Sequence, residues 1–168
     1  VNNNELLIKE LFRPFSPKIW SSKPNTWLSS VDITKIMTQY EKAYNYFKFI
    51  GPSPIDFDSK KMFSTCVWEQ LCNFNLKEHI KNNIRKIGII FNTDPHDKPG
   101  QHWIALFIDI DKKFIFFFDS NGTKMPKEIE TLILSQNIIL GLHQILASPS
   151  FYSRKISLFL KHFSSPKK

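Results

Sequence analysis

The chain has 168 residues, of which 42% are hydrophobic and 14% aromatic, with sixteen Phe. This composition is typical of one globular domain with a substantial core, and it excludes a disordered tail. The formal charge of +8 favours an anionic partner, but the 23 Lys and Arg residues are scattered and form no block longer than two.

The chain carries no recognisable membrane or export signal. No apolar run approaches the roughly 20 residues that a membrane-spanning helix needs. The first residues also lack the basic, then apolar, then small-residue order of a signal peptide. We therefore expect an intracellular, cytoplasmic protein that does not associate with membranes.

The first strong helical pattern follows a capping signal. Ser29 and Asp32 have the spacing of a capping box. The pattern predicts a helix over 31–48, ended by the Gly-Pro-Ser-Pro run at 51–54. Apolar residues recur within it at helical spacing: Ile33, Ile36, Met37, Tyr40, Ala43, Tyr44 and Phe47.

A second helix is expected over 59–72. Its apolar stripe would comprise Phe63, Cys66, Val67, Gln70 and Leu71, so Cys66 would point toward the core. The two cysteines, Cys66 and Cys72, have the spacing of neither a disulfide framework nor a common zinc site. We expect both thiols to be reduced.

The middle of the chain predicts strands. A short run rich in β-branched residues at 87–91 is followed by a loop over 92–100 with two Pro and a Gly. Two further strands, 103–110 and 114–118, are joined by the polar connection 111–113, which has hairpin length. Both strands are apolar on both faces, so we expect them to lie inside a covered sheet.

One more helix is expected over 127–134, with Pro126 at its first turn. The order of helices, strands and a final helix indicates the α+β class. We divide the chain into an irregular, Pro- and Ser-rich lead-in over 1–26, one domain over 27–147, and a tail over 148–168 without clear periodic order.

Two residues of the predicted hairpin carry candidate chemistry. His102 stands at the start of one strand and Asp119 at the end of the next, 17 residues later. If the strands pair antiparallel, these two side chains meet at one sheet edge. A carboxylate there holds the tautomer of the imidazole, and the imidazole can then act as a base toward a thiol.

At these residues the chain resembles the family of ubiquitin-like-protein proteases, which includes SUMO-specific proteases, the adenovirus protease and thiol proteases of large DNA viruses. The resemblance covers residues 27–120 and rests on Trp27-Leu28 before a helix, His102-Trp103 opening a strand, and Asp119-Ser120 after the next. The segments 51–57 and 87–102 look especially like the giant-virus members.

The resemblance implies a papain-like cysteine protease fold, with N-terminal helices packed on a central mixed sheet. It also implies His102 and Asp119 as catalytic residues, and Trp27 and Trp103 as walls of a substrate channel. The family's nucleophile, a Cys-Gly pair, follows its His and Asp, but no Cys follows Cys72 here. Gln144 lies in a segment like the one that carries the family's oxyanion donor. The resemblance therefore implies a catalytic domain over 27–147 that is incomplete at its C-terminus.

Other interpretations of these residues remain open. His102, Trp27 and Trp103 could be structural, and Asp119 could cap a turn, because Asp-Ser-Asn-Gly is good turn chemistry. Cys66 or Cys72 could replace the nucleophile, although buried structural thiols are inert. A zinc site from Cys66, Cys72, His79 and His96 would need spacings that are not recognised ligand pairs, so we expect neither a metal nor another cofactor.

The leading functional hypothesis is a cysteine endopeptidase or isopeptidase, truncated or inactive as given. Its partner would be a protein or peptide, such as a ubiquitin-like tail ending in Gly-Gly or a viral structural precursor. For a viral source, the location would be the host cytoplasm or the virion. The alternatives are a non-catalytic module that binds peptides or ubiquitin-like proteins, and a basic nucleic-acid-binding domain.

Overall fold

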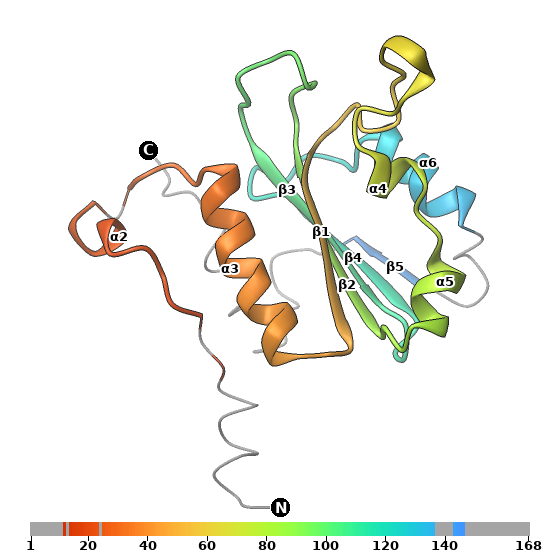
Figure 1. Cartoon of the computed structure of the whole chain (residues 1–168), viewed down its shortest axis with the longest axis horizontal. Coiled ribbons are helices and arrows are strands. Elements are labelled where there is room, and N and C mark those ends of the chain that lie inside the picture. Colours follow the sequence, from red (N-terminus) through yellow and green to blue (C-terminus); the bar gives the residue numbers. More distant parts are fainter. Residues whose placement is uncertain (1–11, 13, 24, 137–142, 147–168) are drawn as a thin grey trace, which may run out of the picture.

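The computed structural model describes residues 12, 14–23, 25–136 and 143–146. It shows a five-stranded mixed sheet in the order β1-β2-β3-β4-β5 (Figure 1). The β1–β2 and β4–β5 pairs are parallel, and the β2–β3 and β3–β4 pairs are antiparallel. The strands are β1 (Phe47–Pro54), β2 (Lys86–Asn92), β3 (Trp103–Asp109), β4 (Phe114–Phe118) and β5 (His143–Leu146).

Helices cover both faces of the sheet. In Figure 1, α3 lies on one side of it and α4, α5 and α6 lie on the other. The α3 side buries a cluster that includes Ile33, Met37 and Phe49, and the opposite side buries a larger cluster around Phe91 and Leu106. The helical elements are α2 (Ile19–Ser22), α3 (Ser30–Ala43), α4 (Glu69–Cys72), α5 (Leu76–Lys81), α6 (Lys127–Ser135) and a 3-10 turn, η1 (Met62–Ser64).

The expected α+β class with a covered mixed sheet is therefore confirmed. The capping box is present as well: the Ser29 hydroxyl accepts from the Asp32 backbone N–H, and the Asp32 carboxylate accepts from the Ser29 backbone N–H. The three predicted strands and the helix after Pro126 lie within a residue of their expected positions. A short helix, α2, lies in the expected lead-in, and no described helix is long and apolar enough to cross a bilayer.

The helix expected over 31–48 is wrong at its C-terminal end. It stops at Ala43, and Phe47 begins β1, where it pairs with Lys86 of β2. The Gly-Pro-Ser-Pro run at 51–54, predicted as a helix breaker, is the second half of β1. Two prolines fit there because β1 is an edge strand, where a missing backbone donor breaks few ladder bonds.

The helix expected over 59–72 is also wrong. Backbone hydrogen bonds fold the segment back on itself, including Lys61 N–H to Thr65 O at 2.7 Å and a bridge between Lys60 and Cys66. Phe63, expected on the buried stripe, is 93% exposed. Only α4 is helical at the end of this segment, while α5 forms in the polar stretch that follows.

Helix α6 offers a direct test of this packing. Ile129 is fully buried against the sheet, whereas Leu134 on the same helix is 55% exposed. Ile129→Ala removes buried methylene groups and leaves a cavity, so we expect it to lower the free energy of unfolding by about 2–5 kcal/mol. Leu134→Ala is the matched control and should change it by about 0.5 kcal/mol or less. Urea denaturation followed by circular dichroism measures both, and equal losses would contradict the packing described here.

Candidate active site

The β3–β4 hairpin brings His102, just before β3, together with Asp119, just after β4, at the open end of the hairpin. Ala105 lies opposite Phe118 in the antiparallel ladder. If that register continued, His102 would lie diagonal to Asp119 on the same face, within side-chain reach. The imidazole Nε2 of His102 lies 2.6 Å from Oδ1 of Asp119. The contact predicted from the 17-residue spacing is confirmed.

The Asp119 carboxylate is held by three donors. Besides the His102 ring, it accepts a hydrogen bond from the Asn121 backbone N–H at 2.8 Å and one from the Thr123 hydroxyl. Its side chain is only 2% exposed. A buried carboxylate needs such partners, and charge-assisted hydrogen bonds of this kind are strong. Asp119 therefore caps its own turn and also binds the histidine.

This geometry decides which nitrogen of His102 can accept a proton. An ionised carboxylate only accepts hydrogen bonds, so Nε2 of His102 must carry the proton that Asp119 receives. In the neutral ring the lone pair is then on Nδ1. The arrangement is that of a base whose tautomer is fixed by a carboxylate on its other nitrogen.

Hydrogen bonds also fix the backbone of His102 and of the loop that precedes it. The His102 carbonyl accepts from Thr93 N–H at 2.9 Å, next to the end of β2. The Asn92 side chain accepts from the backbone N–H groups of Asp94 and Gln101, which closes the loop between β2 and β3. Gly100 has φ +93°, and a Cβ there would lie 2.7 Å from Nδ2 of Asn92. Only glycine fits this close approach without strain.

Trp103 joins the site to the start of α3. Its indole N–H donates to the Leu28 carbonyl at 2.9 Å. Trp27, the residue before Leu28, is 69% exposed. The structure thus places the two predicted channel tryptophans on neighbouring parts of the molecule, and their role in binding substrate stays a prediction.

Gln144 lies on the edge strand β5, where its backbone pairs with Ile115 of β4. Ile115 is four residues before Asp119, which corresponds to roughly 13 Å along the strand. The side chain of Gln144 lies outside the described residues. Its role as an oxyanion donor therefore stays a prediction.

The prediction for the cysteines is wrong. Cys66 is half-buried in an extended segment instead of on a helix, and it forms a disulfide with Cys72. Neither sulfur is a free thiol, so neither is a nucleophile in this structure. Lys60 Nζ lies 3.0 Å from the sulfur of Cys66.

No cluster of three or more His, Cys, Asp or Glu side chains suited to a metal ion occurs in the described part of the chain. Of the two histidines considered for zinc, His79 packs on the ring of Phe74. Burial lowers the pKa of His79, with repulsion from Lys48 adding to the effect and Glu78 opposing it. His79 thus contributes to packing.

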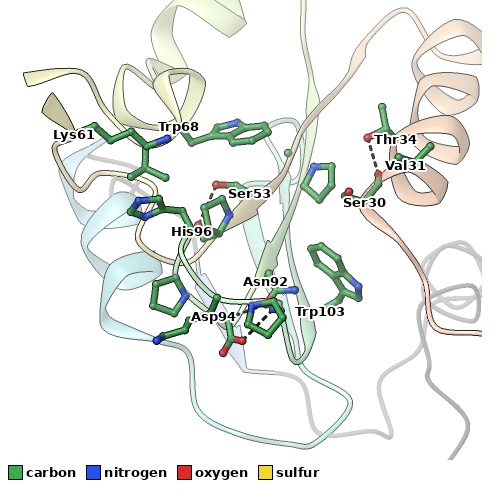
Figure 2. Close-up of a pocket in the computed structure, with 18 of the residues that line it drawn as sticks. Ser30, Val31, Thr34, Ser53, Lys61, Trp68, Asn92, Asp94, His96 and Trp103 are labelled. Atoms are coloured by element: carbon green, nitrogen blue, oxygen red, sulfur yellow. Dashed lines mark hydrogen bonds between the residues drawn. The ribbon is translucent and has the colours of Figure 1, made fainter. Parts of the chain in front are cut away.

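The other histidine belongs to a pair that the sequence did not reveal. Nδ1 of His96 lies 2.6 Å from Oδ2 of Asp56, and the His96 backbone N–H donates to the other oxygen at 2.9 Å. Forty residues separate the two partners, so no local pattern indicates their contact. Together with Trp103, His96 lines a cleft of about 770 Å³ (Figure 2).

Comparisons with known proteins identify the family and the fold of the chain. The model of the family described as the Vaccinia virus I7 processing peptidase matches residues 16–133. A protein of Acanthamoeba polyphaga mimivirus, described as a thiol protease, R355, is 42% identical over 112 residues. That match covers 67% of this chain and 35% of the mimivirus protein, so the chain spans about a third of its relative's length.

Among solved structures, the ASFV pS273R protease aligns with a TM-score of 0.57 at 16% identity, over 86% of this chain and 55% of that chain. A structure of the SUMO protease Ulp1 aligns at a TM-score of 0.48 and 17% identity, over 83% of this chain and 66% of that chain. The ASFV protease alignment supports the protease fold expected from the sequence.

The Asp119 contact makes a prediction about His102 that needs no catalysis. At neutral pH, ¹⁵N NMR of the His102 ring should show the Nε2–H tautomer, because the carboxylate accepts that proton. Asp119→Asn replaces an obligate acceptor with an amide, and we expect the preference for this tautomer to be lost. Asp56→Asn is the matched control and should alter the His96 signals alone. A His102 tautomer that is unchanged by Asp119→Asn would contradict the assigned hydrogen bond.

Proposed function

The chain belongs to the family of the Vaccinia virus I7 processing peptidase, and from this premise we propose that it is the part of a cysteine peptidase that supplies the base and its orienting carboxylate. The observation that carries the proposal is the contact between Nε2 of His102 and Asp119. It leaves Nδ1 as the nitrogen that could accept a proton from a thiol. The proposed activity is that of a ubiquitin-like-protein protease type peptidase acting in the host cytoplasm or in a virion.

In the proposed reaction, Nδ1 of His102 takes the proton of a cysteine thiol. The thiolate then attacks the carbonyl carbon of a peptide or isopeptide bond. The imidazolium that forms is stabilised by Asp119, and it returns its proton to the leaving amine as the C–N bond breaks. Water, deprotonated by the same imidazole, then hydrolyses the thioester and restores the thiol.

The thiol is proposed to come from outside these 168 residues. Both cysteines of the chain precede His102 and are joined to each other. The chain also matches only about a third of the mimivirus relative, which leaves most of that protein unaccounted for. We propose a protein substrate cleaved after small residues, either a precursor of a viral structural protein or a tail ending in Gly-Gly.

The alternative is a module that binds such substrates without cleaving them. It is favoured by one observation: within the described residues a cleft beside Trp103 is formed, while no free thiol is present. The two functions differ in what an added thiol does. Restored turnover supports the enzyme, and binding without turnover supports the module.

We expect no peptidase activity from the 168-residue chain alone, because without a thiolate the acyl-transfer route does not exist. A form extended by a downstream reading frame that encodes Cys-Gly should react with a thiol-directed peptide probe and cleave a fluorogenic Gly-Gly substrate. In that form His102→Ala or Asp119→Asn should lower kcat by about a thousandfold or more.

The matched control in the extended form is Asp111→Asn, which disturbs an exposed ion pair with Arg85 away from the cleft and should leave kcat within a few-fold. Turnover by the short chain, with the probe attached to Cys66 or Cys72, would show that the nucleophile is assigned wrongly. An extended form that keeps full activity after His102→Ala would overturn the proposed base.

A further inference from the structure

The cleft that Trp103 and His96 line crosses the end of β1. Its floor is the run from Gly51 to Pro54, and three other elements form its sides: the first turns of α3, the segment around Lys61 and Trp68, and the loop between β2 and β3 (Figure 2). Trp103, which follows His102 in the chain, also lines it. A ligand in this cleft would therefore contact the residue that follows the proposed base in the chain.

Positive charge reaches the cleft from three separate elements. Lys35 projects from α3, Lys61 precedes η1, and Lys98 belongs to the loop between β2 and β3. Within the described residues none of these three ammonium groups has a carboxylate within 4.0 Å; the ion pairs found involve other cations. The acidic side chain in the wall, Asp94, accepts a hydrogen bond from Gly100 N–H at 3.1 Å. With three lysines and one carboxylate, the lining of the cleft carries a net positive charge.

The side chain of His96 lines the same cleft and is held there by Asp56. Its contacts with Asp56 involve both the ring and the backbone N–H, so the loop that carries Lys98 is tied to the turn after β1. Figure 2 shows His96 near Ser53 and on the same side of the cleft as Lys61 and Trp68. The polar side of the cleft is therefore held in place by a hydrogen-bonded pair.

Most of the remaining surface is apolar, and its prolines make it stiff. Its apolar part consists of Trp68, Trp103, Val31, Val67 and four prolines, Pro52, Pro54, Pro95 and Pro99, beside the polar side chains of Ser30, Thr34, Ser53 and Asn92. Proline lacks a backbone N–H and has a fixed φ, so the floor offers few donors to an added strand. Recognition here must rely on side-chain contacts, with apolar groups against Trp and Pro and anionic groups at the lysines.

We propose that this cleft binds an extended substrate segment in which acidic side chains flank an apolar one, and that it thereby selects which peptide bond reaches His102. The inference rests on the proposed function and adds the class of sequence that the site accepts. A peptide fits better than nucleic acid because the walls are chiefly apolar and Pro-rich and include Trp103, the residue after the proposed base.

The test measures binding to the 168-residue chain, which needs no turnover. Two fluorescein-labelled peptides are compared by fluorescence anisotropy at low salt: one places Glu on both sides of a Leu ahead of Gly-Gly, and the other replaces each Glu with Gln. We expect the Glu peptide to bind about tenfold more tightly, with the difference shrinking as salt is added. Lys61→Gln and Lys98→Gln should each weaken binding of the Glu peptide by about twofold to fivefold.

The matched control is Lys77→Gln, which removes an exposed lysine of α5 outside the cleft. It should leave the affinity unchanged. An equal loss in Lys77→Gln would show that the net charge of the chain, and not the cleft, attracts the peptide, and would overturn the proposal. Equal affinities for the Glu and Gln peptides would also overturn it, as would a single-stranded oligonucleotide that displaces the Glu peptide at lower concentration than the unlabelled peptide does.

This inference and the proposed function fail in distinguishable ways. Selective binding of the Glu peptide by the short chain, together with no turnover in any extended form, would uphold the cleft and overturn the peptidase assignment. Cleavage of the Glu and Gln peptides at equal kcat/KM by an extended form would uphold the peptidase and overturn the cleft's selectivity.

Discussion

A buried carboxylate needs hydrogen-bond donors. At Asp119 these donors connect the turn after β4 with the start of β3. Each donor comes from a different place: the turn backbone at Asn121, the Thr123 hydroxyl, and the His102 ring on the neighbouring strand. The turn after β4 and the start of β3 are thereby fixed to one another. Losing any of these donors would leave part of a buried charge unsatisfied, which is costly. The geometry of the proposed catalytic pair and the local stability thus depend on the same contact.

The β3–β4 hairpin and the contact between His102 and Asp119 could be predicted because the sequence signals for them are local. Two apolar strands joined by a short polar turn define a hairpin, and the hairpin register then brings His102 to Asp119. The capping box at Ser29 and the helix after Pro126 are equally local. Conversely, the contact between Asp56 and His96 depends on the packing of a loop against the turn after β1, forty residues away in the chain, and no periodicity encodes it.

The two incorrect helices have a common cause. Phe47 continues the helical spacing of α3, but the parallel ladder to β2 gives its backbone better partners, so the helix ends at Ala43. Residues 59–68 also match an apolar helical stripe, yet their hydrogen bonds close a tight loop that leaves Phe63 in solvent. A short apolar pattern fits helix, strand and loop alike, and long-range pairing decides among them. The predicted burial of Cys66 failed for the same reason.

The Pro-rich end of β1 connects fold to function. An edge strand with free backbone groups invites pairing with other chains, and Pro52 and Pro54 remove two of its donors. The same prolines form the rigid floor of the cleft. Pro52 and Pro54 therefore both limit pairing at the edge strand and shape the surface that includes Trp103. Trp103 is fixed by its bond to Leu28, and His102 by Thr93 and Asp119. Because every one of these contacts lies within residues 28–123, the proposed base and the cleft that includes Trp103 are formed without any contribution from a thiol. A nucleophile delivered to Nδ1 would meet groups already oriented, and catalysis is most efficient when that orientation precedes the reaction.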